Sequence, residues 1–146
     1  MIDEKDKKIL NELIKNARNT TKNIANNLNI PRITVHDRIK KMVEKKIIKS
    51  FTVIPDYGKL GLTTTVYVFI ALNPYQSNTS AFKIGKQIEK LPGIYEIHII
   101  AGEYDLLIKV RGKTFDEVGR NVIAKIRQID GVGKTFTCPC FRTIKE

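Results

Sequence analysis

The sequence predicts an α+β protein. We expect an N-terminal helix-turn-helix domain of three helices, of the winged type, and a C-terminal ferredoxin-like βαββαβ domain. Two observations predict this class. Apolar residues recur at intervals of three and four from Ile9 to Val43, which is helical periodicity. Beyond residue 63, stretches rich in β-branched and aromatic residues alternate with amphipathic segments. The predicted domains are 1–50 and 64–146, joined by an extended linker or hinge at 51–63.

The first helix is predicted to begin after Asp3, which can cap it, with Asp6 three residues later in its first turn. Thr20 or Thr21 is expected to cap the second helix, and Asn29 to end it in the left-handed conformation. The buried stripe expected for the first helix consists of Ile9, Leu10, Leu13, Ile14 and Ala17.

The third helix is predicted to have Pro31 in its first turn, where the missing N–H costs nothing, and to end near Lys45–Lys46. The faces expected to pack together are Ile24, Ala25 and Leu28 on the second helix and Val35, Ile39, Met42 and Val43 on the third. The opposite face of the third helix carries Ile33, Asp37, Lys40 and Glu44, flanked by His36 and Lys41. A helix supported from behind, with a mostly basic front, is suited to a DNA major groove.

The charge of the chain favours a polyanionic partner. The sequence holds 26 Lys and Arg against 15 Asp and Glu, a net charge of +11. Phosphate backbones attract such a surface and release counterions on binding. A basic composition alone also fits a protein that binds nothing acidic. The prediction of double-stranded DNA as partner therefore depends on the charge and the helical pair together.

Individual DNA contacts are predicted from positions along the third helix. Phosphate contacts are expected mainly from the flanking cations Arg32, Lys41, Lys45 and Lys49. The base-edge candidates are Ile33, Thr34, His36, Asp37 and Lys40. The alternative for each is an ordinary solvated helix face. Arg38 is expected to point toward the edge of the core and to pair with Asp6 or Asp3.

The second domain is predicted to follow the order β-α-β-β-α-β, which places four antiparallel strands under two helices on one face. The strands are expected at Thr64–Leu72, Ile94–Ala101, Tyr104–Arg111 and Val132–Thr143. The helices are expected at Ser80–Leu91 and from Thr114, which is expected to cap the second helix, to about Ile129, and Asn73–Thr79 is expected to be a loop. Their apolar positions are Phe82, Ile84, Ile88 and Leu91 in the first helix and Phe115, Val118, Val122 and Ile126 in the second. Both faces of the first strand are apolar, so a second copy is expected to cover the open face, giving a homodimer.

Several classes of function are disfavoured. No apolar run approaches the ~20 residues of a membrane span, and the N-terminus has no signal segment. We therefore expect a cytoplasmic protein without a membrane partner. Cys138 and Cys140 are one residue apart, unlike a C-x-x-C motif. Two small side chains on one strand face are favoured over an inter-subunit disulfide. No nucleophile, base or metal set is found, so we predict no enzyme, cofactor or metal site.

Short motifs follow one another in a specific order and spacing. They are Asp3-x-x-Asp6-x-x-Ile9-Leu10, Ala25-x-x-Leu28-x-Ile30, Thr34-Val35-His36-x-Arg38-Ile39, Ile47-Ile48, Leu91-Pro92-Gly93, Gly102-Glu103-Tyr104-Asp105 and Gly131-Val132-x-x-Thr135-x-Thr137. Through them the chain resembles the Lrp/AsnC (leucine-responsive, feast-famine) family of transcriptional regulators. The resemblance implies a C-terminal ligand-sensing and oligomerisation domain. It also implies dimers that assemble into tetramers or octamers and amino-acid effectors bound where dimers meet.

The resemblance places the effector loop at Gly102, Glu103, Tyr104 and Asp105, with Thr135 and Thr137 as weaker candidates. Asp105 could hold an ammonium group, although a plain hairpin turn would use the same residues. Two residues depart from the family pattern. Pro31 stands where a capping serine is common. Lys46 stands where glycine is usual, which costs roughly 1 kcal/mol if Lys46 is left-handed.

Taken together, these features predict a sequence-specific DNA-binding transcriptional regulator, dimeric or larger, modulated by a small effector. Two alternatives remain. One is a non-specific architectural protein that wraps DNA, and the other is an amino-acid-binding regulatory subunit that never touches DNA. The first would bind all sequences alike with a steep salt dependence. The second would not bind duplex DNA. A regulator would favour a two-fold symmetric site.

Overall fold

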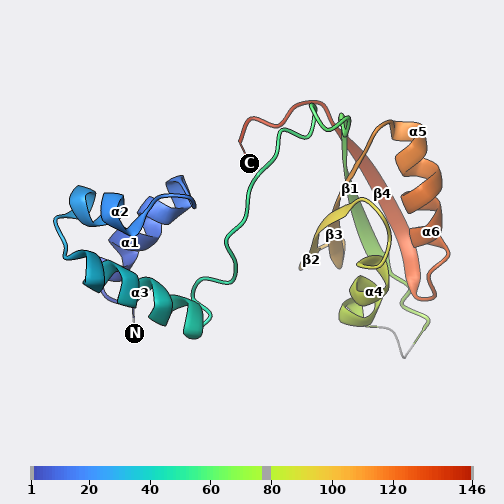
Figure 1. Cartoon of the computed structure of the whole chain (residues 1–146). Coiled ribbons are helices and arrows are strands. Elements are labelled where there is room, and N and C mark those ends of the chain that lie inside the picture. The colour runs from blue at the N-terminus through green and yellow to red at the C-terminus, as the bar shows by residue number, and fades with distance from the viewer. Residues whose placement is uncertain (1, 77–79, 146) are drawn as a thin grey trace. The chain divides into compact units, whose positions relative to one another are not determined.

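A computed structural model gives the structure of the chain and describes residues 2–76 and 80–145 (Figure 1). Its contacts divide the chain into two compact units, Met1–Ile54 and Pro55–Glu146. The first unit is helical, the second combines helices with a sheet, and each has its own core. The predicted α+β class is confirmed.

The first unit begins with α1 (Glu4–Lys15), and the predicted cap at Asp3 is confirmed. The backbone N–H of Asp6 donates to Asp3 Oδ1 at 2.8 Å, and the N–H of Asp3 donates to Asp6 Oδ2 at 3.1 Å. This reciprocal capping box satisfies two N–H groups at the start of the helix. The two carboxylates are therefore held in a defined geometry at the start of α1.

The helix-turn-helix is formed by α2 (Thr21–Leu28) and α3 (Arg32–Glu44). The hydroxyl of Thr20 accepts from the backbone N–H of Asn23 at 3.1 Å, so the predicted capping of α2 is confirmed. Asn29 ends α2 with φ 52°, in the predicted left-handed conformation. The short polar side chain of asparagine tolerates this conformation better than most others. The two helices are thus separated by a tight turn.

The two ends of α3 differ from the usual helix termini. Pro31 precedes the helix as its N-cap residue and provides no side-chain cap, whereas the sequence predicted it within the first turn. At the other end, Lys46 has φ 56°. A lysine therefore makes a left-handed exit that a glycine would make without strain.

The core of the first unit lies between its three helices. Its buried residues are Ile9, Leu13, Ile24, Ala25, Val35, Met42 and Ile48. Three residues predicted to be buried are exposed instead: Ile14, Val43 and Ala17. Ile14 and Val43 each follow a buried residue, and one step rotates a side chain by roughly 100° around the helix. Ala17 lies beyond the end of α1. Three short helices enclose only a narrow stripe of each other's surface.

Between the helices and the sheet, residues 49–56 belong to neither a helix nor a strand. The chain then turns, and the N–H of Leu62 donates to the carbonyl of Tyr57 at 2.9 Å. The Tyr57 ring lies over the guanidinium of Arg111, with 3.8 Å between Cζ and the ring centroid. Tyr57 also meets Tyr95 edge to face at 5.2 Å. These contacts attach the end of the predicted linker to the second unit.

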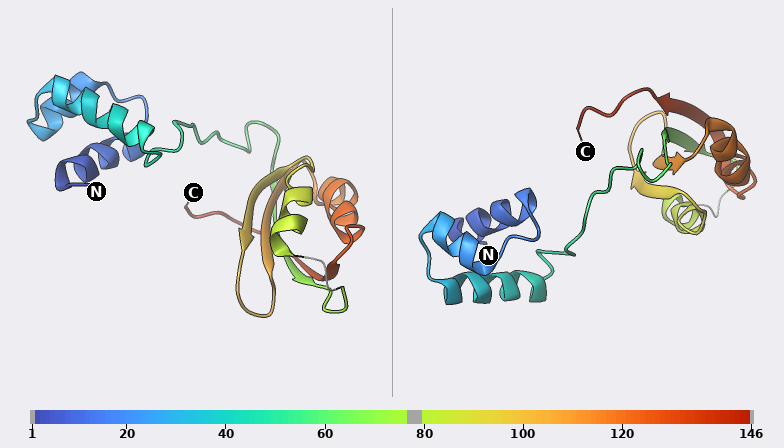
Figure 2. Two further views of the ribbon diagram at one scale, coloured as in Figure 1. Left: turned by 90° about the horizontal axis from the view of Figure 1, so that it is seen from below. Right: turned by 45° about the horizontal axis from the view of Figure 1, so that its top comes forward.

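The second unit contains a four-stranded antiparallel sheet with its helices on one face (Figures 1 and 2). The strand order β2-β3-β1-β4 is that of the predicted ferredoxin-like fold. The strands are β1 (Thr64–Leu72), β2 (Ile94–Ile99), β3 (Leu106–Gly112) and β4 (Val132–Cys140). The observed β4 ends before the predicted Thr143 because its pairing with β1 stops at Cys140, opposite Thr65.

The first helix of this unit, α4 (Ala81–Ile88), is capped by Ser80. Thr114 caps the second helical region, as predicted, but that region is not one regular helix. It consists of α5 (Phe115–Val118), a π-helical turn η1 (Gly119–Ile123) and α6 (Ala124–Arg127). Residues 77–79 of the predicted Asn73–Thr79 loop lie outside the described residues.

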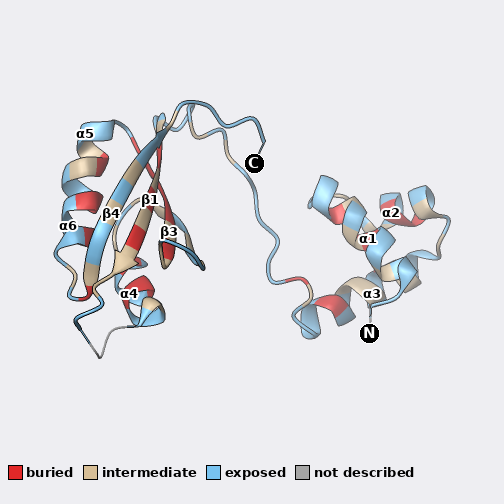
Figure 3. Ribbon diagram, turned by 180° about the vertical axis from the view of Figure 1, so that it is seen from behind, coloured by how far each residue is buried: buried red, intermediate tan, exposed pale blue. Residues whose placement is uncertain are grey.

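The core of the second unit lies between the helices and one face of the sheet, where Figure 3 shows the buried segments in red. It contains Val66, Val68, Ile70, Ile84, Ile88, Leu106, Ile108, Val110, Val118, Val122, Ile123 and Ile126. Phe82 and Phe115, predicted to point inward, are exposed. Phe82 stands two residues before Ile84, which turns it to the other side of α4. Phe115 is the first residue of α5.

The other face of the sheet is a mixed apolar and charged surface. Phe69 of β1 lies opposite Phe136 of β4, and their ring centroids are 6.0 Å apart. Tyr104 joins this cluster at 5.5 Å from Phe69. Lys109 and Arg111 of β3 lie on the same face and are buried. Phe136 is 51% exposed, so half of a large apolar side chain remains uncovered in a single chain.

Candidate nucleic-acid interface and effector loop

The front of α3 is exposed while its back is buried. Ile33 is 76% exposed, whereas Val35 and Met42 on the back are covered by the core. The other predicted contact residues that are exposed are Arg32, His36, Asp37, Lys40, Lys41, Lys45 and Lys49. Thr34 is half-buried. The predicted DNA contacts are therefore open to solvent along α3 and at its exit, except for the partly covered Thr34.

Within the part of the chain that the structure describes, the polar side chains of this surface form pairs that are exposed to solvent. His36 Nδ1 lies 3.3 Å from Asp37 Oδ1, and Lys40 Nζ lies 4.0 Å from a carboxylate oxygen of Glu44. Arg32 Nε donates to the hydroxyl of Thr21 at 3.3 Å. Exposed ion pairs contribute about 0–1 kcal/mol each. These side chains can exchange such contacts for a DNA partner at small cost.

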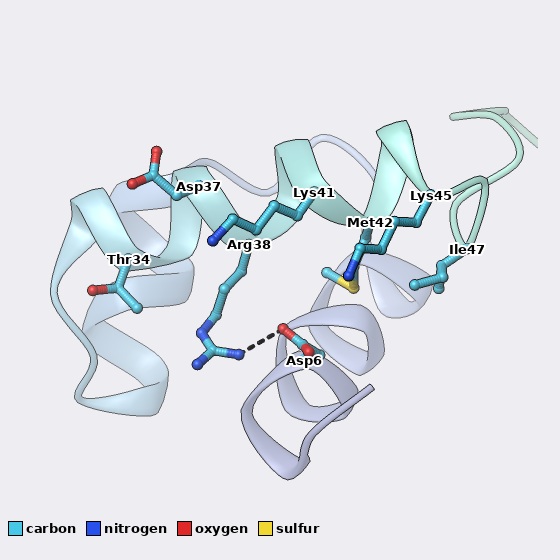
Figure 4. A pocket seen from close by; sticks show the side chains of 8 residues that line it. All are labelled: Asp6, Thr34, Asp37, Arg38, Lys41, Met42, Lys45 and Ile47. Carbon is cyan, nitrogen blue, oxygen red and sulfur yellow. Dashed lines mark hydrogen bonds and ion pairs between the residues drawn. The ribbon is translucent and has the colours of Figure 1, made fainter. Parts of the chain in front are cut away.

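A hollow of about 290 Å³ lies along one flank of α3, between α3 and α1 (Figure 4). It is lined by Asp6, Thr34, Asp37, Arg38, Lys41, Met42, Lys45 and Ile47. Figure 4 shows Arg38 reaching from α3 toward Asp6 of α1, with Lys41 and Lys45 following along the helix. Two predicted phosphate contacts, Lys41 and Lys45, therefore line the same hollow as the Arg38–Asp6 contact between α3 and α1.

Arg38 forms the ion pairs that the sequence predicted. Its Nη1 donates to Asp3 Oδ2 and to Asp6 Oδ1, each at 2.7 Å. The backbone N–H of Asp6 and the Arg38 guanidinium hold the pKa of Asp3 below its usual value. The carboxylates of Asp6 and Asp3 raise the pKa of Arg38. Arg38 is thus committed to α1, in contrast to the lysines beside it.

The predicted effector loop lies between β2 and β3. Gly102 has φ 140° and open space around it. Lys134 Nζ donates to Glu103 Oε1 at 3.2 Å, and this bond raises the pKa of Lys134. Lys134 also lies 5.6 Å from the Tyr104 ring centroid. Asp105 differs from its neighbours, because its Oδ2 accepts from the backbone N–H of Leu72 at 2.7 Å. That carboxylate anchors the loop to β1.

The two weaker effector candidates lie on the other face of the sheet. Thr135 is paired with Ile70 in the register, so both point toward the helices. Arg127 Nε of α6 donates to the Thr135 hydroxyl at 3.0 Å. Thr137 is on the same face, opposite Val68. Within one chain, the structure brings Glu103 and Tyr104 together with Lys134, but it does not bring Thr135 or Thr137 to them.

A polar cluster that the sequence did not single out lies on the open face of the sheet. Lys109 Nζ is 3.1 Å from Glu96 Oε1, and His98 Nε2 is 3.2 Å from Glu96 Oε2. His98 and Lys109 lower the pKa of Glu96. The available signal was the alternation of Lys109 and Arg111 with apolar residues in β3, which places both cations on the Tyr67 side.

Cys138 and Cys140 are both free and lie on one face of β4, opposite Tyr67 and Thr65. Among the described residues, no group of three or more His, Cys, Asp or Glu side chains is placed to hold a metal ion. Across the same residues, no helix combines the length and apolar character that a membrane crossing requires.

Comparison with known proteins assigns each unit to a described domain type. Residues 2–49 match a winged helix-turn-helix DNA-binding domain, and residues 65–146 match the Lrp/AsnC ligand-binding domain. An HTH-type transcriptional regulator of Pyrococcus furiosus is 49% identical over 146 residues, covering 100% of this chain and 97% of the relative.

Two further proteins extend the comparison. The regulator LysM of Saccharolobus solfataricus is 37% identical over 142 residues, with 97% and 95% of the two chains covered. The solved structure of AsnC from E. coli has a TM-score of 0.82 at 26% identity, covering 100% of this chain and 96% of that one. Both units, in the same order, therefore occur together in proteins of this kind.

Proposed function

Because the chain belongs to the Lrp/AsnC family of DNA-binding transcriptional regulators, we propose that it reads duplex DNA as a homodimer with α3 of each copy in a major groove. One observation carries this proposal: α3 exposes a front face flanked by the cations Arg32, Lys41 and Lys45, above a back that is buried in the core. The base-edge contacts are assigned to Ile33, Thr34, His36, Asp37 and Lys40. The phosphate contacts are assigned to Arg32, Lys41, Lys45 and Lys49. A transcriptional regulator works where the genome is, which supports a cytoplasmic location.

The start of α3 supports a further phosphate contact. The first N–H groups of a helix have no partner within the helix and carry a partial positive charge. Pro31 supplies no side chain to cap them, and Arg32 adds a full positive charge beside them. A DNA phosphate at this end would accept from the N–H groups and pair with Arg32.

The open face of the sheet supports the dimer. Tyr67, Phe69 and Phe136 lie on it, and Phe136 remains half exposed in one chain. A second copy of the same face would cover these rings, and its removal from water is favourable by roughly 25 cal/mol per Å² of apolar surface. Dimers of this kind would place two α3 helices on one DNA duplex, and larger assemblies such as tetramers or octamers would extend the contact.

The loop after β2 is the proposed position of an amino-acid effector. Gly102 allows close backbone approach, and Glu103 and Tyr104 present polar groups beside Lys134. Asp105 is expected to shape the loop through its bond to the backbone of β1, so binding is assigned mainly to the residues before it. Thr135 and Thr137 would take part only through contacts on the helix side of β4.

The test is the double substitution of Lys40 and Lys41 by alanine. A binding site is first selected from random duplex DNA with the wild-type chain, and affinity is then measured by fluorescence anisotropy at several salt concentrations. Each lost phosphate contact reduces the slope of log affinity against log salt by about 0.9. The matched control replaces Lys83 and Lys90, two exposed lysines of the second unit, by alanine. It removes the same number of positive charges and leaves α3 unchanged.

We expect the Lys40/Lys41 variant to bind more weakly and its salt slope to shrink by about 0.9, since Lys41 is the assigned phosphate contact of the pair. The Lys83/Lys90 variant should keep the affinity and the slope of the wild type. If the Lys40/Lys41 variant forms a dimer and binds with unchanged affinity, the assignment of α3 to the major groove is wrong. Equal binding of all sequences by the wild type would favour a DNA-wrapping protein instead. Repeating the selection with each amino acid present tests the effector proposal.

A further inference from the structure

A charged junction of Arg38, Asp3 and Asp6 connects α1 to α3. Arg38 Nη1 donates at 2.7 Å to a carboxylate oxygen of Asp3 and at 2.7 Å to one of Asp6 (Figure 4). The side chain of Arg38 is 25% exposed and that of Asp6 is 16% exposed. Partial burial strengthens such charge-assisted bonds relative to those on the surface.

The two carboxylates meet Arg38 in a fixed orientation. Asp3 uses Oδ1 to accept from the N–H of Asp6 and Oδ2 to accept from Arg38. Asp6 uses Oδ2 to accept from the N–H of Asp3 and Oδ1 to accept from Arg38. Each carboxylate therefore divides its oxygens between the backbone of α1 and the guanidinium. Rotation of either side chain would break the capping box, so the junction is tied to the axis of α1.

On the other side, Arg38 marks the boundary between the back and the front of α3. Thr34, Lys41 and Lys45 lie four residues before, three after and seven after it, on the same flank of the helix. Asp37 is its immediate neighbour. A small rotation of α3 about its own axis would carry Arg38 away from the carboxylates and shift Asp37 and Thr34 with it.

We propose that Asp3, Asp6 and Arg38 are positioning residues for base reading: they set the rotation of α3 and do not touch DNA. This inference rests on the proposed entry of α3 into the groove. Apolar packing behind α3 through Val35 and Met42 holds the helix in place, but apolar contacts have little directional preference. The bonds from Arg38 to Asp3 and Asp6 are directional, so they fix the rotation of α3 about its own axis.

The substitution Asp6→Asn separates this role from simple electrostatics, because the two make opposite predictions. It removes one negative charge, so attraction to phosphates alone predicts tighter binding of every duplex. Loss of positioning predicts weaker binding of the selected site. We expect affinity for the selected site to fall by about tenfold, the size of one lost base-pair contact. Affinity for an unrelated duplex of equal length should hold or rise, so the ratio of the two affinities falls.

The matched control is Glu4→Gln. Glu4 lies in the same first turn, its side chain is 79% exposed, and it pairs with Lys7 rather than Arg38. This variant removes the same charge and should leave the ratio unchanged. Arg38→Lys keeps the positive charge but offers one compact ammonium in place of a planar fork. It should reduce the ratio as Asp6→Asn does, whereas an arginine that only attracted phosphates would be replaced without loss.

The ratio is independent of the fraction of folded protein, so a purely structural effect would not change it. Circular dichroism verifies the fold of each variant. If Asp6→Asn does not fold, Asp3→Asn and Arg38→Lys are measured in its place. Equal tightening by Asp6→Asn and Glu4→Gln, or an unchanged ratio in all three junction variants, would overturn the proposal. A wild-type chain without any preferred site would instead contradict the proposed function itself.

Discussion

Replacing Gly93 by alanine tests how closely the backbone packs at the entry to β2. Gly93 has φ 75°, and a Cβ atom there would lie 2.6 Å from the backbone carbonyl oxygen of Arg111. The same segment is held by the N–H of Arg111, which donates to the carbonyl of Gly93 at 2.9 Å. Gly61 has the same φ of 75°, but a Cβ atom at Gly61 would meet nothing within 4 Å. The pair therefore separates conformational strain from steric conflict.

The magnitudes follow from these two environments. An L-residue in the left-handed region costs roughly 1–2 kcal/mol. Alanine recovers about 0.4–1 kcal/mol because it restricts the unfolded chain. Gly61→Ala should therefore lower the free energy of unfolding by roughly 0–1.6 kcal/mol. Gly93→Ala adds a conflict with backbone that cannot move aside like a flexible side chain, worth about 1–3 kcal/mol. The total loss for Gly93→Ala should be roughly 1–4.6 kcal/mol, which exceeds the loss for Gly61→Ala by the about 1–3 kcal/mol of the steric conflict.

The measurement is urea-induced unfolding of both variants and the wild type, followed by circular dichroism. The free energy of unfolding comes from linear extrapolation, and similar slopes would show that the unfolded states are comparable. Both glycines belong to the second unit, so the same transition reports on both. Losses that agree within about 0.5 kcal/mol, the usual limit of additivity errors, would refute the close approach at Gly93.

Three further outcomes are expected from the first unit. Lys46→Gly should raise the free energy of unfolding by roughly 0–1.6 kcal/mol, because glycine relieves about 1–2 kcal/mol of strain at the observed φ of 56° and loses about 0.4–1 kcal/mol through a freer unfolded chain. A loss of stability in urea unfolding would contradict this. Thr20→Ala should lower the free energy of unfolding by about 1 kcal/mol through loss of the cap on α2. Thr20→Asn should leave the free energy of unfolding close to that of the wild type, because asparagine also caps helices. The amide of Asn27 holds the pKa of Glu12 below its ordinary value, as the N–H of Asp6 and Arg38 do for the pKa of Asp3. The contribution of each carboxylate to stability is therefore present above its pKa in the unfolded chain and is lost as the pH falls through its lowered pKa in the folded chain. The melting temperature should fall on acidification below about pH 5, and less steeply in Asp3→Asn.

Local signals predicted the fold well where one or two residues decide the conformation. The side chains predict caps at Asp3, at Thr20 or Thr21, and at Thr114, and a left-handed residue at Asn29; the structure has Asp3, Thr20 and Thr114 as caps and Asn29 left-handed. The strand order followed from the alternation of element types. The π-helical turn could not be predicted, because its sequence keeps apolar residues at spacings that a regular helix would also use.

Burial was harder to predict because it depends on which neighbours cover a face. Ile14 and Phe82 are apolar residues on helices whose covered stripes proved narrow, so both remain exposed. The effector candidates show the same limit in the sheet. Only the register reveals that Thr135 points to the helices while Tyr104 packs with rings on the other face. The bond of Asp105 to the backbone of β1 also requires the paired strands to be known.

The stacking of Tyr57 on Arg111 also fixes the C-terminal end of the linker segment, residues 49–56, between the two units. Before that anchor, residues 49–56 lack helix or strand, and eight residues reach at most ~3.3–3.6 Å each, or about 26–29 Å. In the proposed dimer, the two linker segments would limit the largest separation that the two α3 helices can reach. Inserting residues into this segment would let the same helices accept more widely spaced half-sites without altering a single base contact.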